Sequence, residues 1–112
     1  MEYKSIGVTS NPEKEYLAKI RGTLGWIFYQ QGSYTKAALF LENSIIYQLD
    51  DSKLYAHLAM TYQKMIEFNQ DILRLEYIEK AKRLWNQVIK FDTHKEWEEM
   101  SNKQLGILKE LK

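Results

Sequence analysis

The chain has 112 residues, of which 45% are hydrophobic and 28% are charged, and its net charge is +1. A chain of this length and ordinary composition has room for one folded domain. Its near-zero net charge gives no global attraction to nucleic acid or to an anionic membrane. The absence of cysteine excludes disulfides, thiolate nucleophiles and cysteine-ligated metals. No apolar run approaches the ~20 residues of a membrane span, and the first ten residues lack the apolar core of a secretory signal. We therefore expect a cytoplasmic protein.

Apolar residues recur at helical spacing in five segments of the chain. The polar breaks between these segments predict helices over residues 12–31, 34–49, 52–67, 73–91 and 94–110, and the pattern predicts no strand. The fold class that follows is all-α. We expect each apolar stripe to face the core, and in the first helix that stripe consists of Leu17, Ile20, Leu24, Ile27 and Phe28.

Several helix ends carry recognisable sequence features. Gly32 can adopt the left-handed backbone conformation that commonly terminates a helix. Either Asp51 or Ser52 can cap the third helix through its side-chain oxygen. Thr93 and Glu96 have the spacing of a capping box, in which each side chain bonds to the other's backbone N–H, and they predict the start of the fifth helix.

The sequence contains two similar helical hairpins. A shift of 34 residues matches their first helices, superimposing Leu24, Gly25 and Phe28 on Leu58, Ala59 and Tyr62. A shift of 44 residues matches their second helices, superimposing Ala37, Leu41, Ser44 and Ile45 on Ala81, Trp85, Val88 and Ile89. The second hairpin therefore carries about ten extra residues, which we place near residues 66–75. We expect them to be mobile or to extend the helices.

Residues 24–37 resemble a tetratricopeptide repeat, because the characteristic positions of that pattern hold Leu24, Gly25, Phe28, Gly32, Tyr34 and Ala37. The resemblance covers roughly residues 18–91. It implies a single domain over residues 1–112, built as a right-handed stack of two helical hairpins. These hairpins span about 12–49 and 52–91, and a capping helix follows at about 94–110. About three repeats are usually needed for stability, so self-association could complete the array.

In proteins with this repeat, the first helix of each hairpin lines a concave groove that holds a partner. Carried onto this chain, the resemblance implies a partner-binding groove formed in the first hairpin by Lys19, Gly22, Thr23, Trp26, Tyr29 and Gln30. The second hairpin contributes Lys53, Ala56, His57, Met60, Gln63 and Lys64. We expect Trp26 and Met60 to be anchors for the partner that lie outside the core. Two alternatives stay open: Trp26 could pack against the fifth helix or the N-terminal segment, and His57 could be a packing residue.

The residues give no sign of catalysis. His57 and His94 are the only histidines and lie 37 residues apart; His57 has no acidic partner at helical spacing that would suggest a base, and we expect His94 to be a solvated surface residue. The carboxylates are explained by helix ends and by ion pairs along helices. Glycine-rich phosphate loops are missing. We therefore expect no enzymatic activity, no cofactor and no metal site.

The most plausible function is that of a non-catalytic protein–protein interaction module, a scaffold or adaptor whose partner is a protein or peptide. A basic run could suggest nucleic acid, but the neighbouring acids partly cancel its charge; the run is Lys80, Lys82, Arg83 and Lys90, with Glu76 and Glu79 beside it. We expect neither nucleic acid nor a membrane as partner, and a homo-oligomer remains open. One alternative is a regulatory or sensor subunit that binds a small ligand or nucleic acid. Another is an oligomerisation domain of a larger chain.

Overall fold

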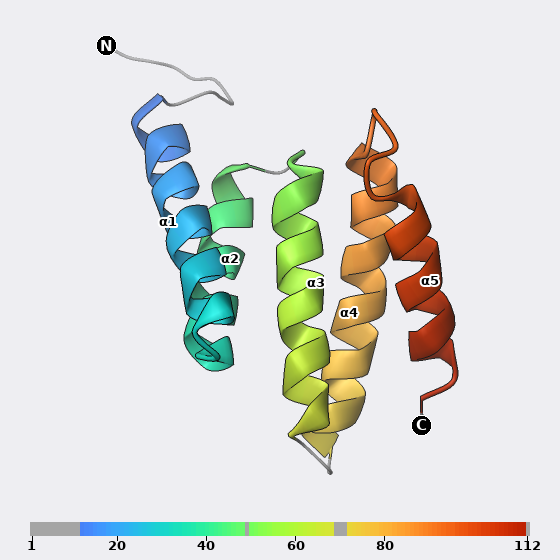
Figure 1. Cartoon of the computed structure of the whole chain (residues 1–112). Coiled ribbons are helices and arrows are strands. Elements are labelled where there is room, and N and C mark those ends of the chain that lie inside the picture. The colour runs from blue at the N-terminus through green and yellow to red at the C-terminus, as the bar shows by residue number, and fades with distance from the viewer. Residues whose placement is uncertain (1–11, 49, 69–71, 112) are drawn as a thin grey trace.

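The computed structural model describes residues 12–48, 50–68 and 72–111, and within these ranges the chain is all-α, as predicted. The helices are α1 (Pro12–Gln30), α2 (Tyr34–Tyr47), α3 (Ser52–Glu67), α4 (Ile72–Phe91) and α5 (Glu98–Lys109) (Figure 1). Each predicted helix has an observed counterpart. In this part of the chain no helix has the length and apolar content needed to cross a membrane.

Neighbouring helices in the chain are also neighbours in space. α1 packs along α2, and α3 packs along α4, so that each pair forms a helical hairpin. The two hairpins meet through α2 and α3, and α5 packs on α4. In Figure 1, α1, α3 and α5 form a front row, while α2 and α4 lie behind them. Because of this arrangement, three helices that are separate in sequence share one face.

The core is centred on the second hairpin. Leu58 of α3, Trp85 and Val88 of α4, and Leu108 of α5 are at most 1% exposed, and Leu41 of α2 closes this cluster from the side of the first hairpin. Burying a side chain of this kind stabilises the fold by roughly 1.5–3 kcal/mol. The second hairpin is therefore the part of the molecule to which the other helices attach.

The first hairpin is held together by small residues. Ala18, Gly22 and Gly25 are the buried residues of α1. The buried hydroxyl of Ser44 on α2 donates a hydrogen bond of 2.6 Å to the Ala18 carbonyl. A methyl group at Gly25 would stand 2.7 Å from Leu41 Cγ. Because α2 lies this close, only small side chains fit on the α1 face that meets it.

The predicted core stripe of α1 is consequently wrong. Leu17, Ile20, Leu24 and Ile27 are between 37% and 41% exposed. They lie on the side of α1 that is turned away from the small residues at the α2 contact. Phe28 alone of the predicted stripe is half-buried, with its ring 5.2 Å from that of Phe40 on α2. An apolar stripe on one helix indicates a face that favours burial, but it does not show which neighbour covers that face.

Two of the predicted helix ends are confirmed. Gly32 has a φ of +83°, in the left-handed region that glycine adopts without steric cost. Of the two candidates for capping α3, Asp51 is the one that does so, because its carboxylate accepts hydrogen bonds from the backbone N–H groups of Lys53 and Leu54.

The predicted start of the fifth helix is wrong. α5 begins at Glu98, and the expected capping box of Thr93 and Glu96 does not form. The Asp92 carboxylate accepts hydrogen bonds from the backbone N–H of Glu96 at 2.9 Å and of Trp97 at 2.7 Å. A short acidic side chain can offer the backbone a local alternative to helix, and here that alternative delays the helix by about one turn.

The extra residues predicted for the second hairpin lie mainly at the ends of two helices. α3 continues through Glu67 and α4 begins at Ile72, so most of residues 66–75 belongs to helices. Of the two expectations for this insertion, helical extension fits these residues. Residues 69–71 lie outside the described part of the chain.

Candidate functional site

The face shared by α1, α3 and α5 is hollowed at two places. The upper hollow has a volume of about 340 Å³ and is lined by Lys19, Gly22, Thr23, Trp26, Gln48, Asp51, Lys53, Leu54 and His57. The lower hollow has a volume of about 220 Å³ and is lined by Tyr29, Met60, Gln63, Lys64, Glu67, Met100 and Gln104. Together they form the candidate groove.

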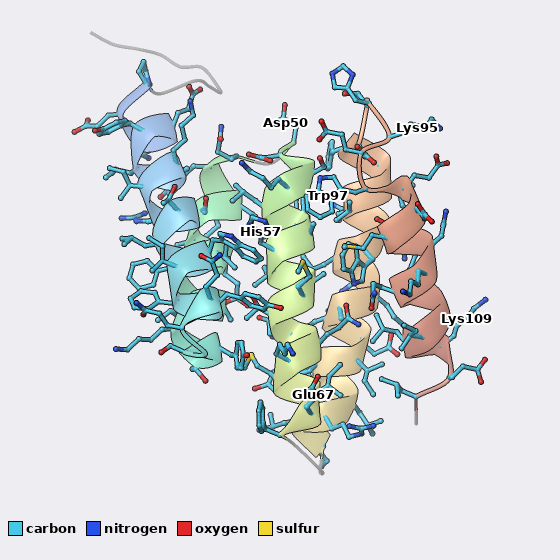
Figure 2. The ribbon with its side chains drawn as sticks, in the orientation of Figure 1. Asp50, His57, Glu67, Lys95, Trp97 and Lys109 are labelled. Atoms are coloured by element: carbon cyan, nitrogen blue, oxygen red, sulfur yellow. The ribbon has the colours of Figure 1, made fainter. Side chains whose placement is uncertain are left out.

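Aromatic rings connect the helices across this face. The rings of Trp26 on α1 and His57 on α3 are stacked, with centroids 3.7 Å apart. Trp26 also stacks on Tyr29 at 4.7 Å. On the other side of His57, the Trp97 ring stands edge-on to it at 6.1 Å (Figure 2). These side chains are half-buried, so each of them still presents part of its apolar surface to an incoming molecule.

The electrostatics at the centre of the groove keep His57 neutral. Burial, and to a smaller extent the positive charge of Lys53, lower the pKa of His57 from 6.5 to about 4, while Asp51 acts in the opposite direction. An uncharged imidazole can stack on Trp26 without the cost of desolvating a cation. At neutral pH His57 therefore contributes aromatic surface, and the positive charge at this place comes from Lys53.

Hydrogen bonds connect the lower hollow to the core. The buried indole of Trp85 donates a bond of 2.7 Å to Oε1 of Gln63. Nε2 of Gln63 in turn donates a bond of 2.9 Å to Oε1 of Gln104 on α5. Burial raises the pKa of the Tyr29 phenol, which lies beside this hollow. The polar floor of the groove is thus held in position from beneath.

Most of the predicted groove residues lie around the two hollows. The upper hollow receives Lys19, Thr23, Trp26, Lys53 and His57, and the lower hollow receives Tyr29, Met60, Gln63 and Lys64. Gln30 is exposed and lines neither hollow. Met60 is half-buried and packs against the buried cluster as well as lining the lower hollow, so it also takes part in the core.

One further residue, Ala56, was placed in the groove incorrectly, whereas Gly22 does line the upper hollow. Ala56 is fully buried inside the molecule. Gly22 borders the upper hollow but is itself buried, because Leu54 and Ser44 approach it closely from the neighbouring helices. The small residue at position 22 allows this close contact between helices.

The contribution of α5 to the groove was not predicted. Trp97 precedes α5, while Met100 and Gln104 belong to it, and all three side chains complete the face built by α1 and α3. The sequence predicts only a capping helix at about 94–110 whose apolar stripe faces the core. Helical periodicity alone does not distinguish a residue that seals a core from one that borders a groove.

The opposite side of the molecule also has a hollow. It measures about 460 Å³ and lies between α2, α3 and α4, with Leu58 and Tyr62 among its apolar residues and Glu42, Lys80 and Arg83 among its charged ones. Burial raises the pKa of the Glu42 carboxyl, and Lys80 opposes this shift. Across the described residues, no group of three or more histidines and carboxylates is arranged to hold a metal ion.

No protein-family model, curated protein or solved structure matches the chain. Function must therefore be inferred from the geometry and chemistry of the site itself.

Proposed function

We propose that the chain is a non-catalytic protein-interaction module of the tetratricopeptide-repeat kind, and that it binds a polypeptide along the groove of α1, α3 and α5. Two observations support a repeat architecture. The helices pair as two successive hairpins, and Gly25 makes the close contact with the following helix that a small residue at this repeat position permits. The capping role falls to α5, which packs on the last helix of the second hairpin.

The observation that carries the proposal is the set of half-buried or exposed apolar side chains on one open face. Trp26, His57 and Trp97 come from three separate segments, and Met60 and Met100 follow them toward the lower hollow. Aromatic residues and methionine supply most of the binding energy at many protein interfaces, because they bury a large apolar area at a small cost in entropy. Flexible methionines also adapt their shape to a partner.

The polar residues of the groove suit a polypeptide partner. Lys19 and Lys53 are exposed at the upper hollow, and Lys64 lines the lower one. The neutral state of His57 leaves its ring available for apolar contact. A peptide could place apolar side chains against the rings while its carbonyl and carboxylate groups meet the surrounding N–H donors.

Affinity capture with matched variants tests this function. Wild-type protein and the double variant Trp26→Ala/Met100→Ala would be used in parallel to capture partners, and each captured protein would then be titrated as a purified component by calorimetry. We expect the double variant to weaken binding by ~2 kcal/mol or more, as the loss of interface anchors typically does. Met60 is a poor choice for this purpose because it also packs against the core.

The control variant is Ile46→Ala. Ile46 lies on α2, it is 57% exposed, and it lines neither hollow of the groove. Its substitution should leave partner affinity unchanged. Equal affinities of wild type and double variant for every captured partner would refute the proposed groove, provided that circular dichroism shows both proteins to be folded.

A further inference from the structure

A continuous apolar stripe on the outer side of α1 is open to solvent. Its members are Leu17, Ile20, Leu24 and Ile27, each between 37% and 41% exposed, and we call these four residues the α1 stripe. Tyr16, at its edge, is 66% exposed. The spacing of three, four and three residues is that of the seam between two paired helices. Exposed apolar residues arranged contiguously on one face usually mark an interaction surface.

The corresponding positions of the second hairpin show what this face does when it is covered. The repeat shift of 34 residues relates Ile20, Leu24 and Ile27 to Leu54, Leu58 and Thr61 on α3. These three α3 residues are 6%, 1% and 0% exposed. Leu54 approaches Gly22 of the first hairpin, so part of this burial comes from the hairpin that precedes α3. Among the described residues, no helix precedes α1 to do the same for the α1 stripe.

We propose that the α1 stripe is a self-association surface, on which two copies of the chain pair α1 against α1 in antiparallel order. In such a pair Leu17 lies opposite Ile27 of the second copy, and Ile20 lies opposite Leu24. Each layer then joins one leucine to one isoleucine. The same patch serves both copies, which is the requirement for a closed twofold dimer.

The charges near the stripe favour the antiparallel order over the parallel one. In the first turn of α1, Glu13 lies four residues before Leu17 and so continues the α1 stripe, whereas Lys14 and Glu15 lie on other sides of the helix. Lys36 lies beside the later part of α1, with its amine 5.6 Å from the centre of the Phe28 ring. Antiparallel pairing brings Glu13 of each copy toward the Lys36 end of the other. Parallel pairing would place the two Glu13 carboxylates together, where they repel each other.

This surface is separate from the groove, since no residue of the α1 stripe lines the upper or the lower hollow. A dimer would therefore present two grooves. A variant that no longer dimerises should still bind a groove partner, and a variant with a damaged groove should still dimerise. Self-association is also independent of the identity of any groove partner, so it can be measured with the protein alone.

Sedimentation equilibrium over a concentration series tests the pairing. Wild type should pass from monomer to dimer, and Leu24→Lys should raise the dissociation constant at least ~tenfold by placing a charge in the seam. The control is Leu39→Lys, because Leu39 is 59% exposed on α2 and does not belong to the α1 stripe. The control should dimerise like wild type. A monomeric wild type, or an equal effect of the two lysines, would overturn the proposal.

Cross-linking tests the order of the helices and does not depend on the stability of a lysine variant. The natural chain has no cysteine, so Leu17→Cys and Ile27→Cys each introduce a single thiol. The mixture of the two proteins should form a disulfide-linked dimer on oxidation, and neither protein should do so alone, because only opposite positions bring two Cα atoms within ~7 Å. Efficient linkage of either variant to itself, or no linkage in the mixture, would contradict antiparallel pairing.

Discussion

Replacing Gly25 with alanine should destabilise the protein, although the same change usually stabilises a helix. The new methyl group would stand 2.7 Å from Leu41 Cγ, 3.1 Å from Leu41 Cδ2 and 3.2 Å from the Ala37 carbonyl oxygen. Leu41 is fully buried, and the atom nearest to the new methyl is its branch carbon. Neither that carbon nor the backbone of α2 can move without disturbing the contact between the two helices.

The expected magnitude is a difference between two opposing effects. Alanine in place of glycine favours a helix interior by ~1 kcal/mol. Overpacking a close contact costs ~1–3 kcal/mol. Since the clash involves a buried branch carbon and a backbone oxygen, we expect the cost to exceed the gain. The net loss of unfolding free energy should then be up to ~2 kcal/mol.

Gly106→Ala is the matched control for this experiment. Gly106 lies inside α5, and a methyl group there would have nothing within 4 Å. The Gly106→Ala substitution should therefore raise the free energy of unfolding by up to ~1 kcal/mol. Thermal unfolding followed by circular dichroism separates the two variants, because ~1 kcal/mol shifts the Tm of a domain this small by ~4–8 °C. A Gly25→Ala protein as stable as Gly106→Ala would show that α1 and α2 are not in close contact at this position.

Two further substitutions test the groove centre and the start of α5. The pKa of His57 is lowered to about 4, first by burial and then by Lys53. In the unfolded chain the His57 imidazole takes up a proton near pH 6.5, whereas in the folded protein it stays neutral down to about pH 4. The free energy of unfolding therefore keeps its full value above pH 6.5 and declines as the pH falls from 6.5 toward 4. With the partial exposure of the ring allowed for, this decline should amount to about 1–2 kcal/mol in urea titrations of the wild type, and it should be absent in His57→Gln. The same pH profile in both proteins would argue against a buried neutral imidazole. Asp92→Ala removes the acceptor of the Glu96 and Trp97 N–H groups. It should lower the free energy of unfolding by about 1 kcal/mol in the same titrations, with Asp92→Asn losing less, and equal losses would mean that the carboxylate bonds are not the cause.

The helices were predictable because the features that define them are local. Apolar periodicity located all five, and Gly32 and Asp51 act at helix ends as their residue types suggest. The orientation of α1 was not predictable in this way. The sequence pattern favours burial of its large residues, yet its buried face is formed by small ones: Gly25 faces α2, and Gly22 faces both α2 and α3. How closely two helices approach depends on the residues of both, which the periodicity of one helix does not reveal.

The candidate groove was predictable in part for a related reason. The repeat register places Trp26 and His57 on corresponding sides of two successive helices, and their rings are in fact stacked. Trp97 and Gln104 were missed, since their position depends on how α5 returns across the molecule. Asp92 holds the segment before α5 through two hydrogen bonds, and the capping-box pattern in the sequence did not indicate this contact.

The bond from Trp85 to Gln63 determines which chemical groups the groove can offer. An indole N–H can only donate, so the Gln63 amide must turn its oxygen toward Trp85 and its nitrogen toward Gln104. Gln104 must then accept through its own oxygen, which leaves its N–H groups for the lower hollow that it lines. A tryptophan in the core thereby fixes the donor and acceptor ends of two glutamine amides, the second of which reaches the lower hollow. A partner group meeting Gln104 should be a hydrogen-bond acceptor, such as a peptide carbonyl, and Trp85→Phe would free both amides to reverse.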